Sequence, residues 1–290
     1  MSDLILQQIA NGLSTGMVYA LIALGLTIVF GVLHVINFAH GEFYMIGALC
    51  SVLLTSRLGI PYLLTVPVAA MAGTVAAIVA DRVGVRPVLP QRDGHSLVLI
   101  TTFAISMLFN ESVLATVGPG PIPSPGIDSG VVSIGPVALS SQRLLVIVLG
   151  LALVVGLEIM LQTTRFGRSL RAVAQSAWAA EIVGIDVRKI GLLSFALAGL
   201  LAGLAGALVV PIVTFSAAMG QHAVINAFVI VVIGSMGNVV GAVVCGVVLG
   251  ILESLSSIFM PTEVSSAIVY SLLLVALLVR PQGMFAGKAR

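Results

Sequence analysis

The chain has 290 residues, of which 59% are hydrophobic and only 8% are charged, and its formal net charge at pH 7 is +2. A water-soluble domain carries about 25% charged residues, so this composition excludes a globule covered by water and indicates a chain surrounded mostly by lipid. We therefore predict an all-α fold, a polytopic membrane bundle of about eight transmembrane helices with further re-entrant or broken segments.

The apolar stretches follow one another along the chain, and a helix that crosses a bilayer needs about 20 such residues. The predicted spans are 8–31, 42–56, 61–80, 96–117, 143–161, 191–213, 239–259 and 264–279. A shorter apolar stretch, 223–234, is about half of a span. Pro and Gly cluster between residues 118 and 136, which predicts an extended loop outside the membrane. No separate soluble domain is expected, so residues 1–290 should form one membrane domain.

Basic residues predict the orientation of these spans, because cytoplasmic loops carry an excess of Lys and Arg. They concentrate in three segments, which we expect to be cytoplasmic, whereas the loop 118–142 should lie on the opposite side. The residues are Arg82, Arg86 and Arg92, then Arg165, Arg168, Arg171, Arg188 and Lys189, then Arg280, Lys288 and Arg290. A cytoplasmic C-terminus then requires 223–234 to cross, fully or in part. The N-terminus lies outside if 8–31 is a single crossing.

The segment VINFAHGEF, residues 35–43, interrupts the first apolar run with several polar residues. Backbone amides freed inside a membrane are costly unless they face protein or a water-filled cavity. We expect a helix break here that lines a pathway, with Gly41 allowing a close approach and Asn37, His40 and Glu42 satisfying freed backbone. Glu42 can either cap amides of the next helix or line the pathway, and capping is the favoured interpretation.

A second interruption, GSMGNVVG at residues 234–241, lies where the chain has to turn back. Gly234, Ser235, Gly237 and Asn238 are its candidate residues, and we treat this break as a second part of the pathway.

Two further carboxylates lie within predicted spans, Glu111 in LFNES and Glu253 in GILES. Ionisable residues inside a membrane are candidates for function, yet each of these can also pair with polar groups on a neighbouring helix. Both interpretations stay open. Glycines spaced by four, such as Gly12 with Gly16 and Gly246 with Gly250, predict close packing of helices.

The loop 162–190 contains an amphipathic pattern, with an apolar face opposite Arg168, Arg171 and Gln175. The apolar positions are Leu170, Val173, Ala174, Ala177 and Ala180. We predict one short helix that ends at Gly184. Periodicity allows a helix lying on the membrane surface, which it slightly favours, or a helix offered to a cytosolic partner.

Two stretches of the sequence only partly match known metal-binding and phosphate-binding motifs. HGEF at 40–43 lacks the second His of a zinc-binding HExxH motif, and GMFAGKA at 283–289 departs from a phosphate-binding loop in spacing and in lacking Ser or Thr after Lys288. We therefore expect no enzyme, no metal and no cofactor of its own. A secondary transporter or a channel remains an alternative on membrane features alone.

Four stretches resemble a known family: residues 31–48, 164–187, 197–208 and 232–253. They are similar, in order and along essentially the whole chain, to permease subunits of bacterial branched-chain amino acid ABC importers, in the LivH-like branch. That family also includes permeases for urea and short amides. The resemblance implies a multi-pass protein of the bacterial inner membrane that forms a translocation pathway together with a second, LivM-like permease.

The resemblance also implies that the loop 162–190 holds a coupling helix that docks on a separate ATPase. The family signature is Glu-Ala-Ala, three residues, then Gly, and the chain follows it except at its first position, where Trp replaces Glu. The implied coupling residues are Arg168, Arg171, Trp178, Ala179, Ala180, Glu181 and Gly184. Two ATP-binding subunits, which use the ATP, and a periplasmic substrate-binding protein are the further implied partners.

Overall fold

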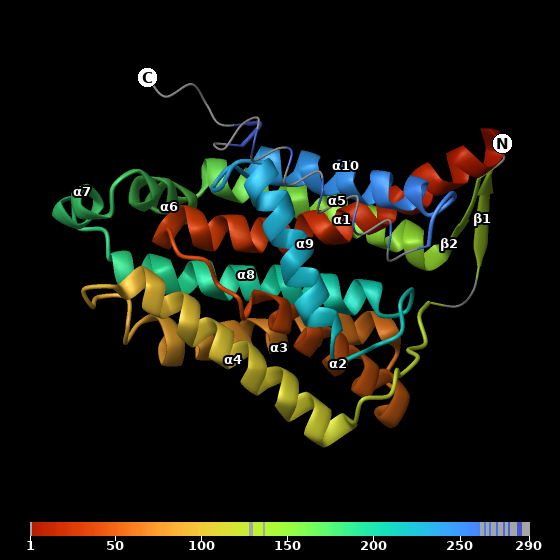
Figure 1. The fold of residues 1–290 in the computed structure, drawn as a ribbon, viewed down its shortest axis with the longest axis horizontal. Helices are drawn as coiled ribbons and strands as arrows, with labels where there is room; N and C mark the ends of the chain where they lie inside the picture. Colours follow the sequence, from red (N-terminus) through yellow and green to blue (C-terminus); the bar gives the residue numbers. More distant parts are fainter. Residues whose placement is uncertain are drawn as a thin grey trace.

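The computed structural model describes residues 2–127, 130–135 and 137–261, together with residues 264, 267, 271, 275, 278 and 283–285. Helices dominate this part of the chain, and one small two-stranded sheet accompanies them (Figure 1). The elements are α1 (Ser2–Leu33), α2 (His40–Leu58), α3 (Tyr62–Ala80), the π-helical turn η1 (Asp81–Val85), α4 (Gly94–Val117), β1 (Val131–Ile134), β2 (Val137–Ser140), α5 (Ser141–Thr163), α6 (Arg165–Gln175), α7 (Ala177–Ile182), α8 (Val187–Val209), α9 (Met219–Ile233) and α10 (Val239–Ser256).

Six helices of the described residues are long and apolar enough to cross a membrane: α1, α3 with η1, α4, α5, α8 and α10. The helix α9 is apolar but has only 15 residues. The helix α2 has 19 residues and carries Glu42 in its first turn and Arg57 in its last. This arrangement confirms the predicted all-α membrane bundle. The last predicted span, 264–279, lies largely outside the described residues.

The bundle is built around α1 and α8. In the most apolar window of each helix, 78% of α1 and 61% of α8 is buried, against 17% of α4 and 22% of α5. The helix α1 packs against α10, α8, α9 and α5. The faces of α4 and α5 are therefore left for lipid or for other chains.

Glycines let α1 and α10 approach closely, as their spacing predicted. A Cβ added at Gly12 would lie 2.8 Å from the carbonyl oxygen of Gly250, and one at Gly16 would lie 3.1 Å from that of Gly246. The nearest backbone atoms are closer still, the Cα atoms of Ile251 at 2.6 Å and of Val247 at 2.7 Å, so contact between the two backbones requires glycine.

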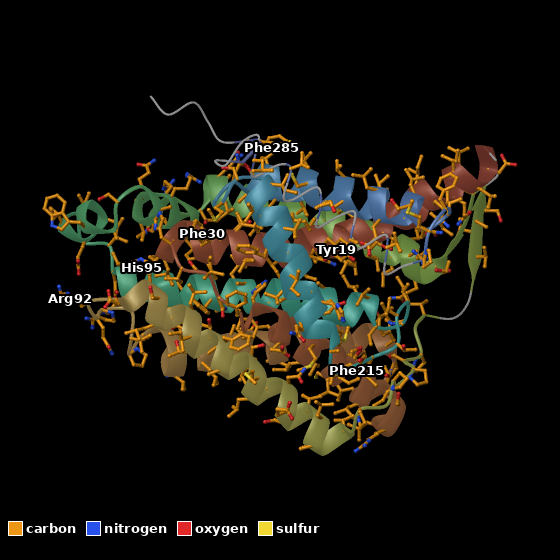
Figure 2. All side chains as sticks on the ribbon, in the orientation of Figure 1. Tyr19, Phe30, Arg92, His95, Phe215 and Phe285 are labelled. Atoms are coloured by element: carbon orange, nitrogen blue, oxygen red, sulfur yellow. The ribbon has the colours of Figure 1, made fainter. Side chains whose placement is uncertain are left out.

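The two ends of the bundle differ in charge. One end, which we call the basic end, carries η1, α6, α7 and the turn between α9 and α10, and Figure 2 labels Arg92 and His95 there. The basic residues of this end are Arg82, Arg86, Arg92, Arg165, Arg168, Arg171, Arg188 and Lys189. The opposite end, the hairpin end, carries β1, β2 and the start of α1 (Figure 1). The first and second predicted basic segments thus lie together, opposite the loop 118–142.

Residues 118–136 were predicted to form a loop throughout, but the last part of this segment forms a β-hairpin with the residues that follow. The strands β1 and β2 pair antiparallel, with Val131 opposite Ser140. The β-branched residues Val131, Val132, Ile134 and Val137 favour these strands. The Gln7 side chain continues the sheet, since its amide donates to the carbonyl oxygen of Ala138 at 2.8 Å and accepts from the Ala138 amide at 2.9 Å. The hairpin is therefore fastened to the start of α1.

The helix α1 ends at the basic end, and residues 34–39 then lead back into the bundle. The imidazole Nε2 of His40, the first residue of α2, donates to the carbonyl oxygen of Ile22 at 2.9 Å. Ile22 lies eleven residues before the end of α1, or about 16 Å along its axis. Since a bilayer core is about 30 Å thick, α2 begins near mid-membrane. From there it runs to the hairpin end.

The second half of the chain repeats this path in the opposite direction. The helix α8 ends at the hairpin end, residues 210–218 lead back, and α9 begins inside the bundle and runs to the basic end, crossing the other helices steeply in Figure 1. The return segment 210–218 is held by Asn110, whose side chain donates to the carbonyl oxygen of Ala217 at 2.8 Å. Two helices that begin inside the bundle and run in opposite directions, as α2 and α9 do, are typical of transporter folds.

Candidate functional site

The helices α2 and α9, which both begin inside the bundle, meet at their first turns. A Cβ added at Gly41 would collide with the carbonyl oxygen of Gly220, and one added at Gly220 would lie 2.9 Å from the carbonyl oxygen of Gly41. The predicted role of Gly41, a close approach of two backbones, is therefore what the structure shows. The partner of Gly41 is a residue that sequence reasoning missed.

The two helix starts are built alike. Ala39 precedes α2 with φ −72° and ψ −3°, and Ala218 precedes α9 with φ −73° and ψ −10°. In each case a polar side chain two residues earlier accepts from the alanine amide: the Asn37 Oδ1 atom at 3.0 Å and the Ser216 Oγ atom at 3.4 Å. The sequences AHGE (39–42) and AMGQ (218–221) align, so Glu42 corresponds to Gln221.

Backbone groups freed at the first break find partners from several elements. Asn37 takes the predicted role through its bond to Ala39, and the Phe38 amide donates to the Thr102 hydroxyl of α4 at 3.3 Å. The His40 side chain does not bond the backbone freed at residues 34–39. It donates instead to the carbonyl oxygen of Ile22 in α1. Its ring lies edge-on to Phe43, with centroids 5.7 Å apart.

Glu42 does not cap the amides of α2, which was the favoured interpretation of this residue. No side chain caps the first turn of α2. Instead the Glu42 Oε1 atom accepts from the Ser106 hydroxyl of α4 at 2.9 Å. The side chain is only 1% exposed, and Oε2 has no hydrogen-bond partner within the described residues. The carboxylate thus faces away from its own helix start, towards α4 and α9.

A pocket of about 310 Å³ opens beside Glu42, between α2, α4 and α9. Glu42, Ser106, Asn110, Glu111 and Gln221 provide its polar groups, and its apolar lining consists of Phe38, Phe103, Met107, Val224 and Ile225. Glu111 is exposed on α4 and makes no hydrogen bond or ion pair within the described part of the chain. One pocket therefore gathers two of the predicted carboxylates.

Glu253 has a structural setting. Its Oε2 atom accepts from the Tyr19 hydroxyl at 2.8 Å, and that hydroxyl accepts from the Asn226 side chain at 3.1 Å. The network joins α10, α1 and α9. Of the two open interpretations for Glu253, pairing with a neighbouring helix is the one that the structure shows.

The second predicted break is a turn at the basic end and not an interruption inside the membrane. Ser235 and Gly237 have positive φ values of 74° and 87°, as a tight turn requires. The Asn238 side chain begins α10 by accepting from the Gly241 amide at 3.0 Å, and it donates to the carbonyl oxygen of Phe285 at 3.0 Å. A Cβ at Gly234 would lie 2.7 Å from the Gly241 backbone. The interruption inside the membrane is 210–218.

The amphipathic segment forms two helices where one was predicted. Ser176 has extended backbone angles, φ −162° and ψ 109°, and its hydroxyl accepts from the Ala179 amide, which ends α6 and starts α7. Of the predicted apolar face, Leu170, Val173 and Ala180 are buried. Ala177 is exposed, because it follows the break.

The tip at α7, which projects from one end of the bundle in Figure 1, exposes large apolar side chains. Trp178 is 75% exposed, Ile182 64% and Val183 74%. Ala179 and Glu181 are also exposed, whereas Ala180 is buried beneath them. Gly184 ends α7 with φ 86°, and the amides of Gly184 and Ile185 donate back into its last turn. This ending confirms the predicted stop.

Arg168 and Arg171 lie on α6 and are exposed, although the Arg171 guanidinium also donates to the carbonyl oxygen of Leu161. That bond ties α6 to the end of α5. The tip therefore projects from the bundle on a fixed base.

Comparison with known proteins identifies the family. The family model "Branched-chain amino acid transport system / permease component" matches residues 8–277. The high-affinity branched-chain amino acid transport system permease proteins LivH of Escherichia coli (strain K12) and BraD of Pseudomonas aeruginosa are each 31% identical to the chain; both alignments cover 96% of it, and 94% and 95% of the relative. LivM of E. coli (strain K12) is 27% identical over 92% of the chain and 68% of its own length.

A solved structure supports the fold. PsaBC from Streptococcus pneumoniae in complex with Fab matches with a TM-score of 0.52 and 13% identity, covering 95% of this chain and 92% of that one. At this identity the likeness concerns the fold alone. On the family model and the relatives together, the chain is a multi-pass membrane protein that belongs to the family of branched-chain amino acid transport system permease components.

Proposed function

We propose that the chain is the integral membrane permease subunit of an ABC importer and that it forms, with a second permease, a translocation pathway for branched-chain amino acids. The observation that carries this proposal is the similarity to LivH and BraD, which extends across 96% of the chain. The names of these relatives favour branched-chain amino acids over urea or short amides.

The tip at α7 supports docking of a separate ATPase. Exposed apolar side chains at the polar end of a membrane bundle mark an interaction surface, and an exposed Trp is a frequent anchor in such surfaces. Trp178 stands at the position of the family's Glu, so an apolar contact replaces an ion pair there. The basic residues of the same end place the docking side in the cytoplasm, and ATP is used by the docked subunits.

The α4 face supports pairing with a second permease. Glu111 is exposed on this face in a predicted membrane span, and carboxylates in membranes face protein or water-filled cavities. A LivM-like chain is the proposed partner, because LivM of E. coli is itself similar to this chain. The pairing would cover Glu111 and enclose the pocket beside Glu42.

The remaining assignments follow from this orientation. The hairpin end faces the periplasm of a bacterium whose inner membrane holds the bundle, and a soluble substrate-binding protein delivers the solute there. Phe285, bound to Asn238 at the basic end, supports a C-terminus on the cytoplasmic side.

Uptake in cells tests the proposal. The chain is expressed with its partner subunits in cells that lack branched-chain amino acid uptake, and entry of labelled leucine, isoleucine, valine, urea and acetamide is measured. We expect entry of the three amino acids only, and only with ATP-competent partners. Entry of urea or acetamide without leucine would contradict the assigned substrate. ATP hydrolysis by the purified chain alone would contradict the proposal that separate subunits hydrolyse ATP.

A further inference from the structure

One oxygen of the buried Glu42 carboxylate has no hydrogen-bond partner among the described residues. A buried carboxylate is tolerated in a protein when its oxygens are bonded or paired. Oε1 binds the Ser106 hydroxyl at 2.9 Å, but Oε2 has no partner within the described residues, and the side chain is 1% exposed. Oε2 lies over the first turn of α9, where a Cβ on Gly220 would be 2.8 Å from it.

Glu42 is among the residues that line a pocket suited to a small amphipathic solute. The volume of about 310 Å³ falls at the lower limit of small-molecule sites, which occupy about 300–1,000 Å³. Its lining combines polar groups from α2, α4 and α9 with the apolar side chains of Phe38, Phe103, Val224 and Ile225. The pocket therefore offers both carboxyl groups and an apolar surface near mid-membrane.

The two helix starts at this pocket add a complementary charge. Each helix N-terminus carries a partial positive charge, and both α2 and α9 begin here. A zwitterion with an apolar side chain finds all three of its groups matched: an acceptor for its ammonium, a positive helix end for its carboxylate and an apolar wall for its side chain.

We propose that the pocket between α2, α4 and α9 is a transient binding site for the transported amino acid, with Glu42 Oε2 accepting its ammonium group and the start of α9 facing its carboxylate. This assignment rests on the function proposed above. It makes Glu42 a determinant of selectivity within the membrane, in addition to any selection made by a binding protein.

Binding of radiolabelled leucine to the purified, assembled transporter without its binding protein tests the site. We expect Glu42→Gln to weaken leucine binding roughly tenfold or more, because a charge-assisted hydrogen bond is lost. Ile225→Trp, which fills the pocket without altering Glu42, should weaken it as well. The matched control is Glu253→Gln, which changes another intramembrane carboxylate outside the pocket and should leave leucine binding unchanged. In the wild type, 4-methylpentanoate, which lacks the ammonium group, should not compete with leucine.

The outcomes separate this proposal from the function on which it rests. Leucine uptake by the wild type, with unchanged leucine binding in both pocket variants, would overturn the site and leave the transport function standing. Loss of the second permease from the Glu42→Gln complex would show that Oε2 binds a protein partner, which also overturns it. Absence of leucine uptake by the wild type would instead overturn the transport function.

Discussion

Gly41 and Gly220 lie backbone to backbone where α2 and α9 begin, although 179 positions separate them in the sequence. The contact joins the two inverted halves of the bundle near mid-membrane. It also places Glu42 against the start of α9.

Replacing Gly41 with Ala should destabilise this junction. Its Cβ would collide with the carbonyl oxygen of Gly220, so two backbones would have to separate, and overpacking of this kind costs about 1–3 kcal/mol. Thermal unfolding of the purified complex in detergent measures the effect. Gly156→Ala on α5 is the matched control, because nothing lies within 4 Å of a Cβ there. Equal melting temperatures for the two variants would contradict the described junction.

Replacing Tyr19 with Phe should loosen the packing of α1 against α9 and α10. The change removes the hydroxyl that bonds both Glu253 and Asn226, and among the described residues it leaves the Glu253 carboxylate without a donor, at a cost of about 1–3 kcal/mol. Tyr44→Phe serves as control, since the Tyr44 hydroxyl makes no hydrogen bond among the described residues. A stability loss confined to Tyr44→Phe would refute the network.

Trp178→Ala should impair coupling without destabilising the chain. The side chain is 75% exposed, so its removal leaves the bundle intact, whereas loss of an interface anchor costs about 2 kcal/mol or more in binding. Co-purification of the ATPase subunits and leucine uptake should both fall, with an unchanged melting temperature. Leu151→Ala, at an exposed position of α5 (55%), should affect neither. Full uptake by Trp178→Ala would remove this residue from the docking surface.

Gly184→Arg should abolish uptake while the protein still inserts. Gly184 has φ 86° and Gly59, at the other end of the bundle, has φ 64°, so both substitutions impose similar backbone strain of about 1–2 kcal/mol. Only Gly184 borders the proposed ATPase dock. Gly59→Arg should therefore retain uptake when both variants are present in the membrane at equal amounts. Equal losses of uptake in the two variants would show that backbone strain alone causes the effect and would contradict docking at Gly184.

Sequence reasoning located the first break but not its counterpart. The polar residues of VINFAHGEF interrupt an apolar run, so hydropathy reveals them. Residues 210–218 begin with apolar residues that merged with the preceding span, which was predicted to continue to residue 213. The repeat of AHGE in AMGQ was the available signal, and it gains meaning only once both helices are known to start inside the bundle.

Contacts between residues far apart in the chain could not be predicted from the sequence. Local periodicity predicted the amphipathic face of α6, because it depends on neighbours within a few turns. The bond between Tyr19 and Glu253 joins positions 234 residues apart, and no local pattern encodes it. The break at Ser176 was missed because helical spacing of apolar residues outweighed a Ser that can cap a new helix.

An importer driven by cytoplasmic ATPase subunits requires the α6–α7 tip to face the cytoplasm, and labelling of single cysteines measures this directly. In a chain with Cys50 and Cys245 replaced by Ala, Ala177→Cys at the tip and Val131→Cys on the hairpin are treated with a membrane-impermeant maleimide in right-side-out and inside-out vesicles. We expect residue 177 to react only in inside-out vesicles and residue 131 only in right-side-out vesicles. Reaction of residue 177 in right-side-out vesicles would place the tip outside the cell, where no ATPase can reach it, and would contradict the proposed importer.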